Sequence, residues 1–222
     1  MKPNDAPHPP SPSTDAGQGA ATLPPVKPDL GDGLSLWQLV RADYEALVAL
    51  ERIRPHSLRR QLDVLAQPGF WAVLNFRFSV ACHRAGLIPL ARLLFLWNLF
   101  VFGTEMAPRA RVGPGLAVPH PICTGFSGAT RIGRNVVLLT GAHLGVGGYD
   151  EPGRDGYPTI GDGCRIMDGA KVLGPVEIGP GAVIGANALV MRSIPAGAIV
   201  VSPPARVVRI QSPDAPPETS GP

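Results

Sequence analysis

The chain has 222 residues, a formal net charge of +3 and a large share of turn-forming residues, with 27 glycines and 26 prolines. This length allows one large domain or two small ones. The positive charge is weak and forms no basic stripe with interleaved aromatic residues, so we expect no nucleic-acid partner. The three cysteines form no CxxC pair, which argues against a disulfide framework and a thiolate zinc site and favours a cytoplasmic location.

The proline-rich ends of the chain lack apolar periodicity. Residues 1–33 and 211–222 are therefore predicted to be disordered tails. Between the tails the apolar pattern changes once, near Gly103. We expect an α-helical domain over residues 34–103 and a second domain over residues 104–210.

Apolar residues recur at helical spacing in the first of these domains. A first helix is expected from Ser35, which forms a capping-box signature with Gln38, and it ends before Pro55. A second helix is expected between Ser57 and Gln67.

Two further apolar segments complete the helical domain. A third helix is expected over residues 70–86 and a fourth in the run 87–103, LIPLARLLFLWNLFVFG. That run is shorter than the roughly 20 apolar residues that span a bilayer, and it contains Pro89, Arg92 and Asn98. We expect a helix buried between packed neighbours, with peripheral membrane contact as the alternative.

Beyond Gly103 the aliphatic residues recur every six positions. The period is strict in the C-terminal part of the second domain, where small residues tend to stand two positions earlier and glycine one position later. The strict aliphatic positions are Ile160, Ile166, Val172, Ile178, Ile184 and Val190, and Val112, Val118, Ile132, Leu138 and Leu144 continue the grid upstream. A short strand that ends in a corner has this period. We therefore predict a mainly β fold, a three-faced parallel β-helix with about eighteen residues per coil.

The six-residue pattern breaks twice, and an interruption of a regular lattice points to function. Fourteen residues instead of twelve separate Val118 from Ile132, and sixteen instead of six separate Leu144 from Ile160. The first break holds His120, whose two neighbouring prolines restrict the backbone. The second break is predicted to be a loop that serves as a binding element.

The chain resembles the serine acetyltransferase branch of the left-handed β-helix acyltransferases, closest in character to exopolysaccharide O-acetyltransferases. The likeness rests on GTEMAPRARVGPGLAVPH at 103–120, on the Gly-rich loop and on the C-terminal PPARVV motif, and it covers residues 35–210. It implies a left-handed β-helix and transfer of an acetyl group from acetyl-CoA to a hydroxyl. It also implies a homotrimer, since the family's active site forms between prisms, with a hexamer as the alternative.

The resemblance implies catalytic roles for His120 and Glu105. In the family, the histidine at this point takes the proton from the acceptor hydroxyl, and an upstream aspartate orients the ring. The matching residue here is Glu105, fifteen residues before His120, so the carboxylate is kept on a side chain one methylene longer. A carboxylate in that place fixes the imidazole tautomer and stabilises the imidazolium as it forms.

The positions that bind the acceptor depart from the family pattern. The family's serine-binding aspartate corresponds to Pro119, and its Arg-His pair corresponds to Gly156 and Tyr157. The loss of these charged groups is expected to weaken amino-acid binding, while proline and tyrosine offer apolar surface to a sugar. We therefore expect a sugar or polysaccharide acceptor, with L-serine as the alternative. His143, beside the second break, is either a substitute polar group in the site or an ordinary outward residue of a coil.

The resemblance also suggests which residues line the groove for acetyl-CoA. The matching positions are Gly145, Asp168, Ala186 and, near the phosphates, Arg206. Asp168 stands where the family has a small neutral residue. No metal is expected, because a catalytic zinc needs three protein ligands and the prism half holds only two histidines. A scaffold without catalytic activity is the competing class of function.

Overall fold

The computed structural model describes residues 25–50, 63–147 and 156–204. Within these ranges three helices come first and short strands follow. The helices are α1 (Leu36–Leu50), α3 (Pro68–Arg84) and α4 (Ile88–Phe102). The strands are β1 (Glu105–Met106), β2 (Arg111–Val112), β3 (Gly125–Phe126), β4 (Arg131–Ile132), β5 (Val137–Leu138), β6 (His143–Gly145), β7 (Thr159–Ile160), β8 (Arg165–Ile166), β9 (Lys171–Leu173), β10 (Glu177–Ile178), β11 (Val183–Ile184), β12 (Leu189–Val190) and β13 (Ile199–Val200).

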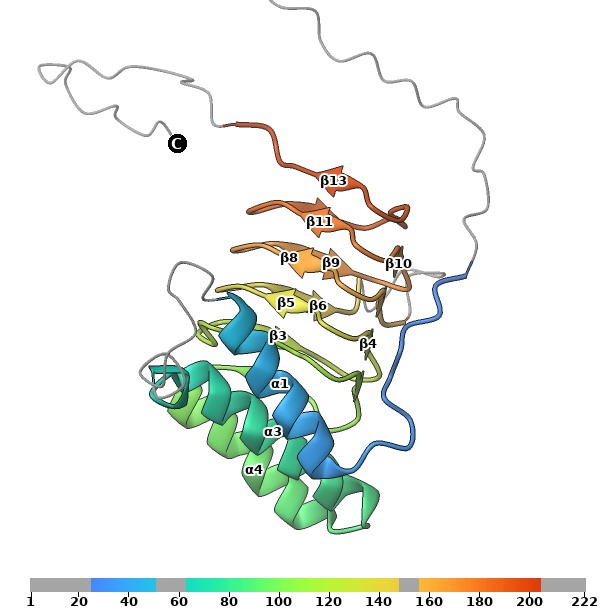
Figure 1. Ribbon diagram of the computed structural model, residues 1–222. Coiled ribbons are helices and arrows are strands. Elements are labelled where there is room, and N and C mark those ends of the chain that lie inside the picture. The colour runs from blue at the N-terminus through green and yellow to red at the C-terminus, as the bar shows by residue number, and fades with distance from the viewer. Residues whose placement is uncertain (1–24, 51–62, 148–155, 205–222) are drawn as a thin grey trace, which may run out of the picture.

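The strands form the three faces of a prism, with the helices gathered at its N-terminal end (Figure 1). Sheet A has the strand order β1-β3-β6-β9-β12, sheet B the order β2-β4-β7-β10, and sheet C the order β5-β8-β11-β13. Neighbouring strands on a face are parallel and come from successive coils, as when Ile166 pairs with Ile184, eighteen residues further on. The predicted three-faced parallel β-helix is therefore present.

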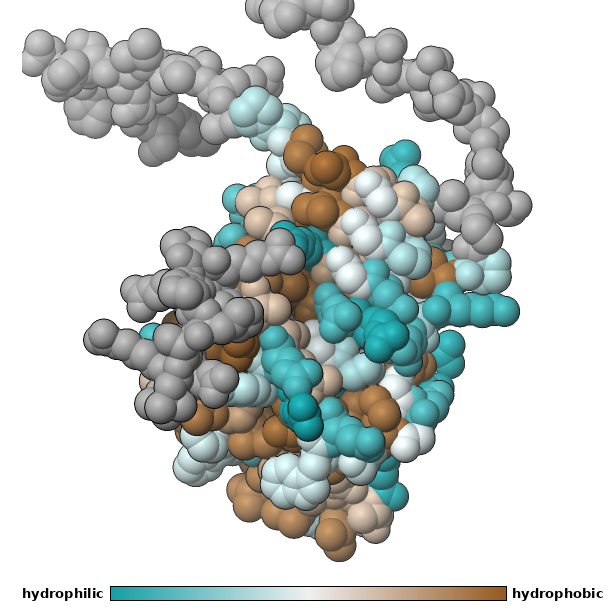
Figure 2. Space-filling view, viewed as in Figure 1, coloured by the Kyte–Doolittle hydropathy of each residue, from teal (hydrophilic) through white to brown (hydrophobic). Residues whose placement is uncertain are grey.

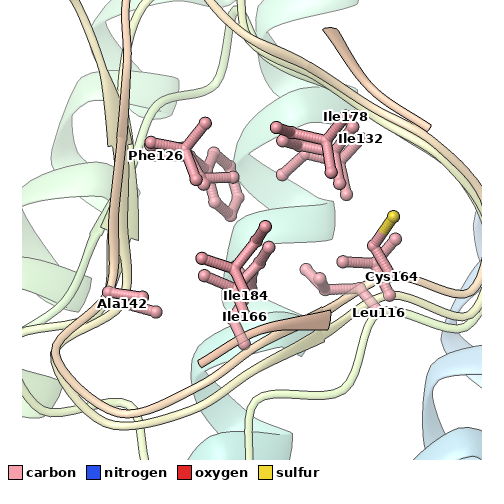
Figure 3. Close-up of a cluster of buried hydrophobic side chains, with 14 of the residues drawn as sticks. Leu116, Phe126, Ile132, Ala142, Cys164, Ile166, Ile178 and Ile184 are labelled. Atoms are coloured by element: carbon pink, nitrogen blue, oxygen red, sulfur yellow. The ribbon is translucent and has the colours of Figure 1, made fainter. Parts of the chain in front are cut away.

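The residues of the six-residue pattern fill the interior of the prism. The six strictly spaced aliphatic side chains are at most 3% exposed. In Figure 3, Ile132 and Ile178 lie in one column and Ile166 and Ile184 in another. The small residues two positions earlier are buried as well, and burial raises the pKa of the Cys164 thiol to about 11. That thiol stays protonated and serves as a small apolar group of the core.

Helix α3 covers the open end of the prism. The first coil of a solenoid has no preceding coil to bury its interior, so another element must cover it. Phe76 of α3 and Phe126 of β3 meet edge to face, with ring centroids 5.1 Å apart, and both side chains are buried. The helical and strand segments therefore share one hydrophobic core.

A buried ion pair ties two helices to the first coil. The Arg77 guanidinium donates to both carboxylate oxygens of Asp43, at 2.8 and 2.9 Å. The same guanidinium donates to the carbonyls of Val112 and Gly113, and one Asp43 oxygen accepts from the amides of Gly115 and Leu116. Each charge thus has both an opposite charge and additional hydrogen bonds, which a buried pair requires.

Two of the helix predictions are confirmed. Ser35 and Gln38 form the predicted capping box, since the Ser35 amide donates to the Gln38 side chain at 2.8 Å and the Gln38 amide donates to Ser35 Oγ at 3.4 Å. The third helix is α3. The second predicted helix falls largely on residues 51–62, outside the described residues.

The expectation of a fully buried fourth helix is wrong. Of the residues in α4, only Ala91 and Asn98 are buried. The reason is that α3 packs along one narrow side of α4, which leaves most of its apolar side chains exposed. Among the described residues, no helix is both long enough and apolar enough to cross a bilayer.

The end of the segment predicted to be a disordered tail runs along the prism. The amide of Val26 donates to Glu177 at 2.7 Å, and the amide of Asp29 donates to Asp162 at 2.9 Å. Asp32 forms an ion pair with Arg111. Polar side chains at the outer edge of sheet B thus hold residues 25–33, which have no apolar period of their own. The predicted tails 1–24 and 211–222 lie outside the described residues.

Candidate active site

The first break in the repeat is a turn that carries His120. The interior position after Val118 is Phe126, eight residues on instead of six, and both side chains are fully buried. The two additional residues therefore lie between Pro119 and Gly125. The side chain of His120 is exposed on this turn. Phe126 was not predicted as an interior residue, because only aliphatic residues were considered in the six-residue pattern. Its position six residues before Ile132 would have identified it.

The start of α3 presses directly against the backbone of this turn. A Cβ placed on Gly69 would lie 1.8 Å from the Val118 carbonyl oxygen and 3.0 Å from that of Pro119. A side chain cannot be accommodated at such a distance, so the contact requires glycine. Helix α3 therefore supports the residues immediately before His120.

The end of α4 holds the same turn from the other side. The amide of Cys123 donates to the Gly103 carbonyl, which follows α4, at 2.8 Å. The Thr104 hydroxyl donates to the Thr124 carbonyl at 2.6 Å, and Thr124 Oγ1 lies 3.3 Å from the His120 carbonyl and 3.0 Å from that of Leu139. The backbone that carries the imidazole is thus fixed by two helices and by the next coil.

The outer face of sheet A presents a column of four residues beside this turn. Strand pairing places Glu105 next to Gly125, Gly125 next to His143, and His143 next to Lys171. Adjacent members are one strand spacing apart, about 4.8 Å. Gly125 has no side chain, and a Cβ there would lie 2.6 Å from the Glu105 carbonyl oxygen. We call this arrangement the sheet A column; it presents a carboxylate, a glycine packed closely against Glu105, an imidazole and an ammonium in series.

The column sets the protonation of His143. Burial lowers the pKa of this half-buried imidazole, the positive charge of Lys171 lowers it further, and the negative charge of Glu105 opposes both effects. His143 is therefore held neutral at neutral pH and can accept a hydrogen bond or a proton. The Lys171 ammonium is itself fixed, because it donates to the Gly141 carbonyl at 2.5 Å.

Glu105 and His120 lie on neighbouring coils, as expected, since Glu105 pairs with Gly125 at the end of the His120 turn. No hydrogen bond or ion pair joins these two side chains in the part of the chain that the structure describes. The negative charge of Glu105 acts to raise the pKa of His143. The dyad of Glu105 and His120 therefore stays a prediction.

Tyr157 packs on Gly128, in the turn that follows β3, close to the second break. A Cβ on Gly128 would fall 1.9 Å from the tyrosine ring, so the ring lies directly on that glycine. A Cβ on Gly145 would lie 3.2 Å from His143 Nε2 and 3.4 Å from Ser127 Oγ. The absence of a side chain at Gly145 leaves room beside the His143 imidazole, and its absence at Gly128 allows the Tyr157 ring to lie on the backbone. Pro119 is half-buried in the turn before β3.

The residues expected to bind acetyl-CoA occupy two places. Gly145 ends β6 on sheet A, beside His143. Asp168 and Ala186 are exposed at one corner in successive coils, where the Asn187 amide donates to the Asp168 carbonyl at 2.8 Å. Arg206 lies outside the described residues. No group of three or more residues suited to a metal ion occurs within the described ranges.

Two residues that shape the site were missed from the sequence. Lys171 has the same outward place as His143 one coil later, and counting outward positions of the repeat would have found it. Gly69 is the second residue of α3, and nothing in the local sequence indicates that this helix touches the turn of His120. Its role depends on a contact between segments about fifty residues apart.

These features define a hexapeptide-repeat transferase built on a left-handed β-helix. The model of the family described as bacterial transferase hexapeptide (six repeats) matches residues 157–192. A serine acetyltransferase from Helicobacter pylori is 34% identical over 163 residues, which is 72% of this chain and 94% of that protein.

Solved structures agree with the sequence comparison. Neisseria gonorrhoeae serine acetyltransferase in complex with serine has 31% identity and a TM-score of 0.67, covering 78% of this chain and 68% of that one. A serine acetyltransferase complex with CoA has 27% identity and a TM-score of 0.67, covering 78% of this chain and 70% of that one. A more distant neighbour from Entamoeba histolytica is covered over only 61% of its length. The chain belongs to the serine acetyltransferase family, and the predicted left-handed fold and O-acetyltransferase class are confirmed.

The comparisons overturn the expected acceptor. Relatives over most of this chain are named serine acetyltransferase, and one is solved with serine. The sugar or polysaccharide acceptor is therefore wrong, and the closer likeness to exopolysaccharide enzymes gains no support. That inference treated two missing charged side chains as evidence for a neutral acceptor. A missing charge weakens one ligand without selecting another, and the fold supplies charge elsewhere, at Glu105 and Lys171.

Proposed function

We propose that this protein is an acetyl-CoA-dependent serine O-acetyltransferase. The observation that carries the proposal is the family relation over most of the chain, which brings solved relatives in complex with serine and with CoA. The sheet A column supports the same acceptor. A zwitterionic amino acid carries a carboxylate, and the column offers an ammonium for it at Lys171, next to His143.

His120 acts as the general base in this proposal. Its neutral imidazole takes the proton from the serine hydroxyl while that oxygen attacks the thioester carbonyl carbon. The tetrahedral intermediate then collapses, the carbon–sulfur bond breaks, and the imidazolium returns the proton to the leaving CoA thiolate. The turn is held by α3 and α4 through Gly69 and Gly103, which provides the fixed position that a general base requires.

The sheet A column orients the acceptor. Lys171 attracts the serine carboxylate, and Glu105, three strand spacings away on the same face, orients the His120 ring as in the family. His143 is held neutral by burial and by Lys171, so it accepts a hydrogen bond from the substrate without adding charge. Tyr157 and Pro119 form the apolar boundary of the acceptor site.

Acetyl-CoA is the acetyl donor in the proposal, with Gly145, Asp168, Ala186 and Arg206 along its groove. Asp168 at an exposed corner and Gly145 on sheet A form one wall of this groove. In the proposal, a neighbouring prism supplies the opposite wall. The protein is therefore proposed to work as a homotrimer, with a hexamer as the alternative, and to be located in the cytoplasm. The domain bounds 34–103 and 104–210 remain part of the proposal, supported by the end of α4 at Phe102 and the start of β1 at Glu105.

The proposal is tested with purified full chain, acetyl-CoA and a panel of hydroxyl acceptors, by following release of the CoA thiol. L-serine is expected to give the highest kcat/KM, and D-serine, L-threonine and glycerol report how strictly the acceptor is recognised. The variant His120→Ala is expected to lose about 10²–10⁴-fold in kcat. His83→Ala, at the end of α3, is the matched histidine control and is expected to keep full activity.

Three results would reject the proposal. Turnover of L-serine no faster than that of glycerol would show that the column does not recognise an amino acid. Full activity of His120→Ala would remove the imidazole from the mechanism. A chain that binds CoA in calorimetry but releases no thiol with any acceptor would be a scaffold without catalytic activity.

A further inference from the structure

Helices α3 and α4 form a pair with polar contacts inside and apolar side chains outside. Asn98 Nδ2 donates to the Ala72 carbonyl at 3.0 Å, and Asn75 Nδ2 donates to Asn98 Oδ1 at 2.8 Å and to the Leu94 carbonyl at 2.7 Å. Ser79 Oγ donates to the Ala91 carbonyl at 2.9 Å. The buried stripe of α4 consists of Ala91 and Asn98. Small and polar residues at a helix interface are typical of helices that face lipid.

The outer side of α4 is a broad apolar surface. Its exposed side chains include Phe100 at 81%, Leu93 at 62% and Trp97 at 57%. We call these residues and their neighbours on the helix the α4 face; it comprises Leu87, Ile88, Leu90, Leu93, Leu96, Trp97, Leu99, Phe100 and Val101. In Figure 2, hydrophobic side chains gather at the lower end of the molecule, where Figure 1 places the helices. A monomeric soluble protein rarely exposes so continuous an apolar surface.

The charges around the α4 face favour an anionic surface as its occupant. The sequence from residue 64 to residue 104 contains no aspartate or glutamate. Arg84 and Arg92, at the end of α3 and within α4, are exposed. All three tryptophans of the chain, Trp37, Trp71 and Trp97, are at least 48% exposed, and tryptophan is enriched where an apolar interior meets water at a membrane surface.

The length of α4 determines whether the helix could cross a membrane or only lie on its surface. Its 15 residues extend about 22 Å, less than the roughly 30 Å of the hydrocarbon core. The helix therefore cannot cross a bilayer and instead lies in the interface plane with its apolar side in the acyl region. The exposed Ile122 in the turn of His120 touches the end of α4, since a Cβ on Gly103 would lie 4.0 Å from it. The C-terminal end of α4 therefore lies beside the proposed active site.

We propose that the α4 face docks this protein onto the surface of an anionic lipid bilayer. The aliphatic and aromatic side chains enter the outer acyl region, and Arg84 and Arg92 contact the lipid phosphates. Polar contacts between α3 and α4 hold the pair together without using the apolar side chains. This inference concerns the helices and is independent of the acceptor of acetyl transfer.

The test is flotation of the full chain with vesicles of phosphatidylcholine alone and of phosphatidylcholine mixed with phosphatidylglycerol. Binding to the anionic vesicles is expected, and weaker binding to the neutral ones. Leu93→Ser and Phe100→Ser are each expected to weaken partitioning roughly tenfold. Arg84→Gln and Arg92→Gln are each expected to weaken binding only to the anionic vesicles, by roughly fivefold.

The matched control is Ile199→Ser, which removes an equally exposed aliphatic side chain from β13 at the far end of the prism. It is expected to bind vesicles as the unchanged chain does. A second measurement uses the double variant Trp37→Phe, Trp71→Phe, in which the emission of Trp97 is expected to shift to the blue when anionic vesicles are added. Because all substituted side chains are exposed, the circular dichroism of each variant is expected to stay unchanged.

Three outcomes would overturn the proposal. One is a chain that does not float with either vesicle. Another is equal binding by Phe100→Ser and Ile199→Ser. The third is an oligomer in light scattering whose mass falls on Phe100→Ser while no vesicle is bound, which would show that a second copy covers the α4 face. In every case the acetyl-transfer assay without vesicles reports separately on the proposed function.

Discussion

The coils on either side of the second break differ in regularity and in chemistry. Residues 156–190 follow the six-residue pattern without interruption, and each coil there contacts mainly the coils beside it. The last coil is two residues shorter, since Ile184 pairs with Val200, sixteen residues further on. Residues 104–147 contain the His120 turn, the start of the sheet A column and the contacts with α3 and α4. The comparison teaches that the regular repeat supplies rigid spacing, whereas the candidate chemistry gathers where other elements press against the repeat.

The largest effect is expected from cutting the link between the helices and the first coil. Asp43→Ala leaves the buried Arg77 without its counter-ion and two backbone amides without their acceptor. We expect the free energy of unfolding to fall by about 3–5 kcal/mol, measured by urea denaturation. Glu45→Ala, which removes an exposed ion pair on the same helix, is the control and should cost less than about 1 kcal/mol. Equal losses for the two variants would contradict the role of the pair.

The contact of α3 with the His120 turn is the next test. In Gly69→Ala the new methyl group would overlap the Val118 carbonyl, so the turn or the helix must move. We expect kcat to fall on the order of 10²-fold, because small displacements of a catalytic group have effects of this size. Gly163→Ala is the control in the regular part: it strains a backbone with φ of 69° at a corner where nothing lies within 4 Å. The Gly163→Ala variant should lose stability and keep kcat. An unchanged kcat in Gly69→Ala would show that the contact of α3 with the His120 turn does not position the catalytic residue.

The charge of the sheet A column gives a smaller effect. Lys171→Met removes the ammonium beside His143. A charge-assisted hydrogen bond is worth about 1.5–3 kcal/mol, so we expect KM for L-serine to rise roughly 10- to 100-fold with little change in kcat. Arg165→Met, an exposed cation on sheet C, should leave KM unchanged. A fall in kcat without a change in KM would mean that Lys171 does not bind the acceptor.

The smallest expected effect is on the titration of His143, followed by NMR of its imidazole. Lys171→Met should raise the pKa of His143, because the lysine lowers it, and Glu105→Gln should lower that pKa, because the carboxylate raises it. The pKa of this imidazole is below its unfolded value of about 6.5 in the folded chain. The unfolded state therefore binds more protons in that range, and His143 makes the fold less stable as pH falls below about 6.5. If the pKa of His143 shifted in the opposite direction in either variant, the charges of Glu105 and Lys171 would not control the protonation of His143.

The repeat and its two breaks could be predicted from the sequence, because one side chain in six must fill the prism and no other local rule produces that period. His120 was found in this way, since a break in a lattice is visible without coordinates. The capping residues Ser35 and Gln38 were equally visible, as a cap depends on neighbours three residues apart. These features are local or periodic, and the sequence by itself therefore determined them.

Only the tertiary structure decided which side chains meet across coils and between domains. The approach of Gly69 to Val118, the ion pair of Asp43 with Arg77, and the placing of Lys171 beside His143 all join segments that are distant in the chain or lie on successive coils. The exposed side of α4 was likewise wrongly predicted to be buried. An apolar composition indicates that burial of the helix is favourable, but it does not identify the segment that would bury it. These contacts depend on packing between segments that are distant in the chain, and a local sequence pattern does not reveal which distant segments will pack together.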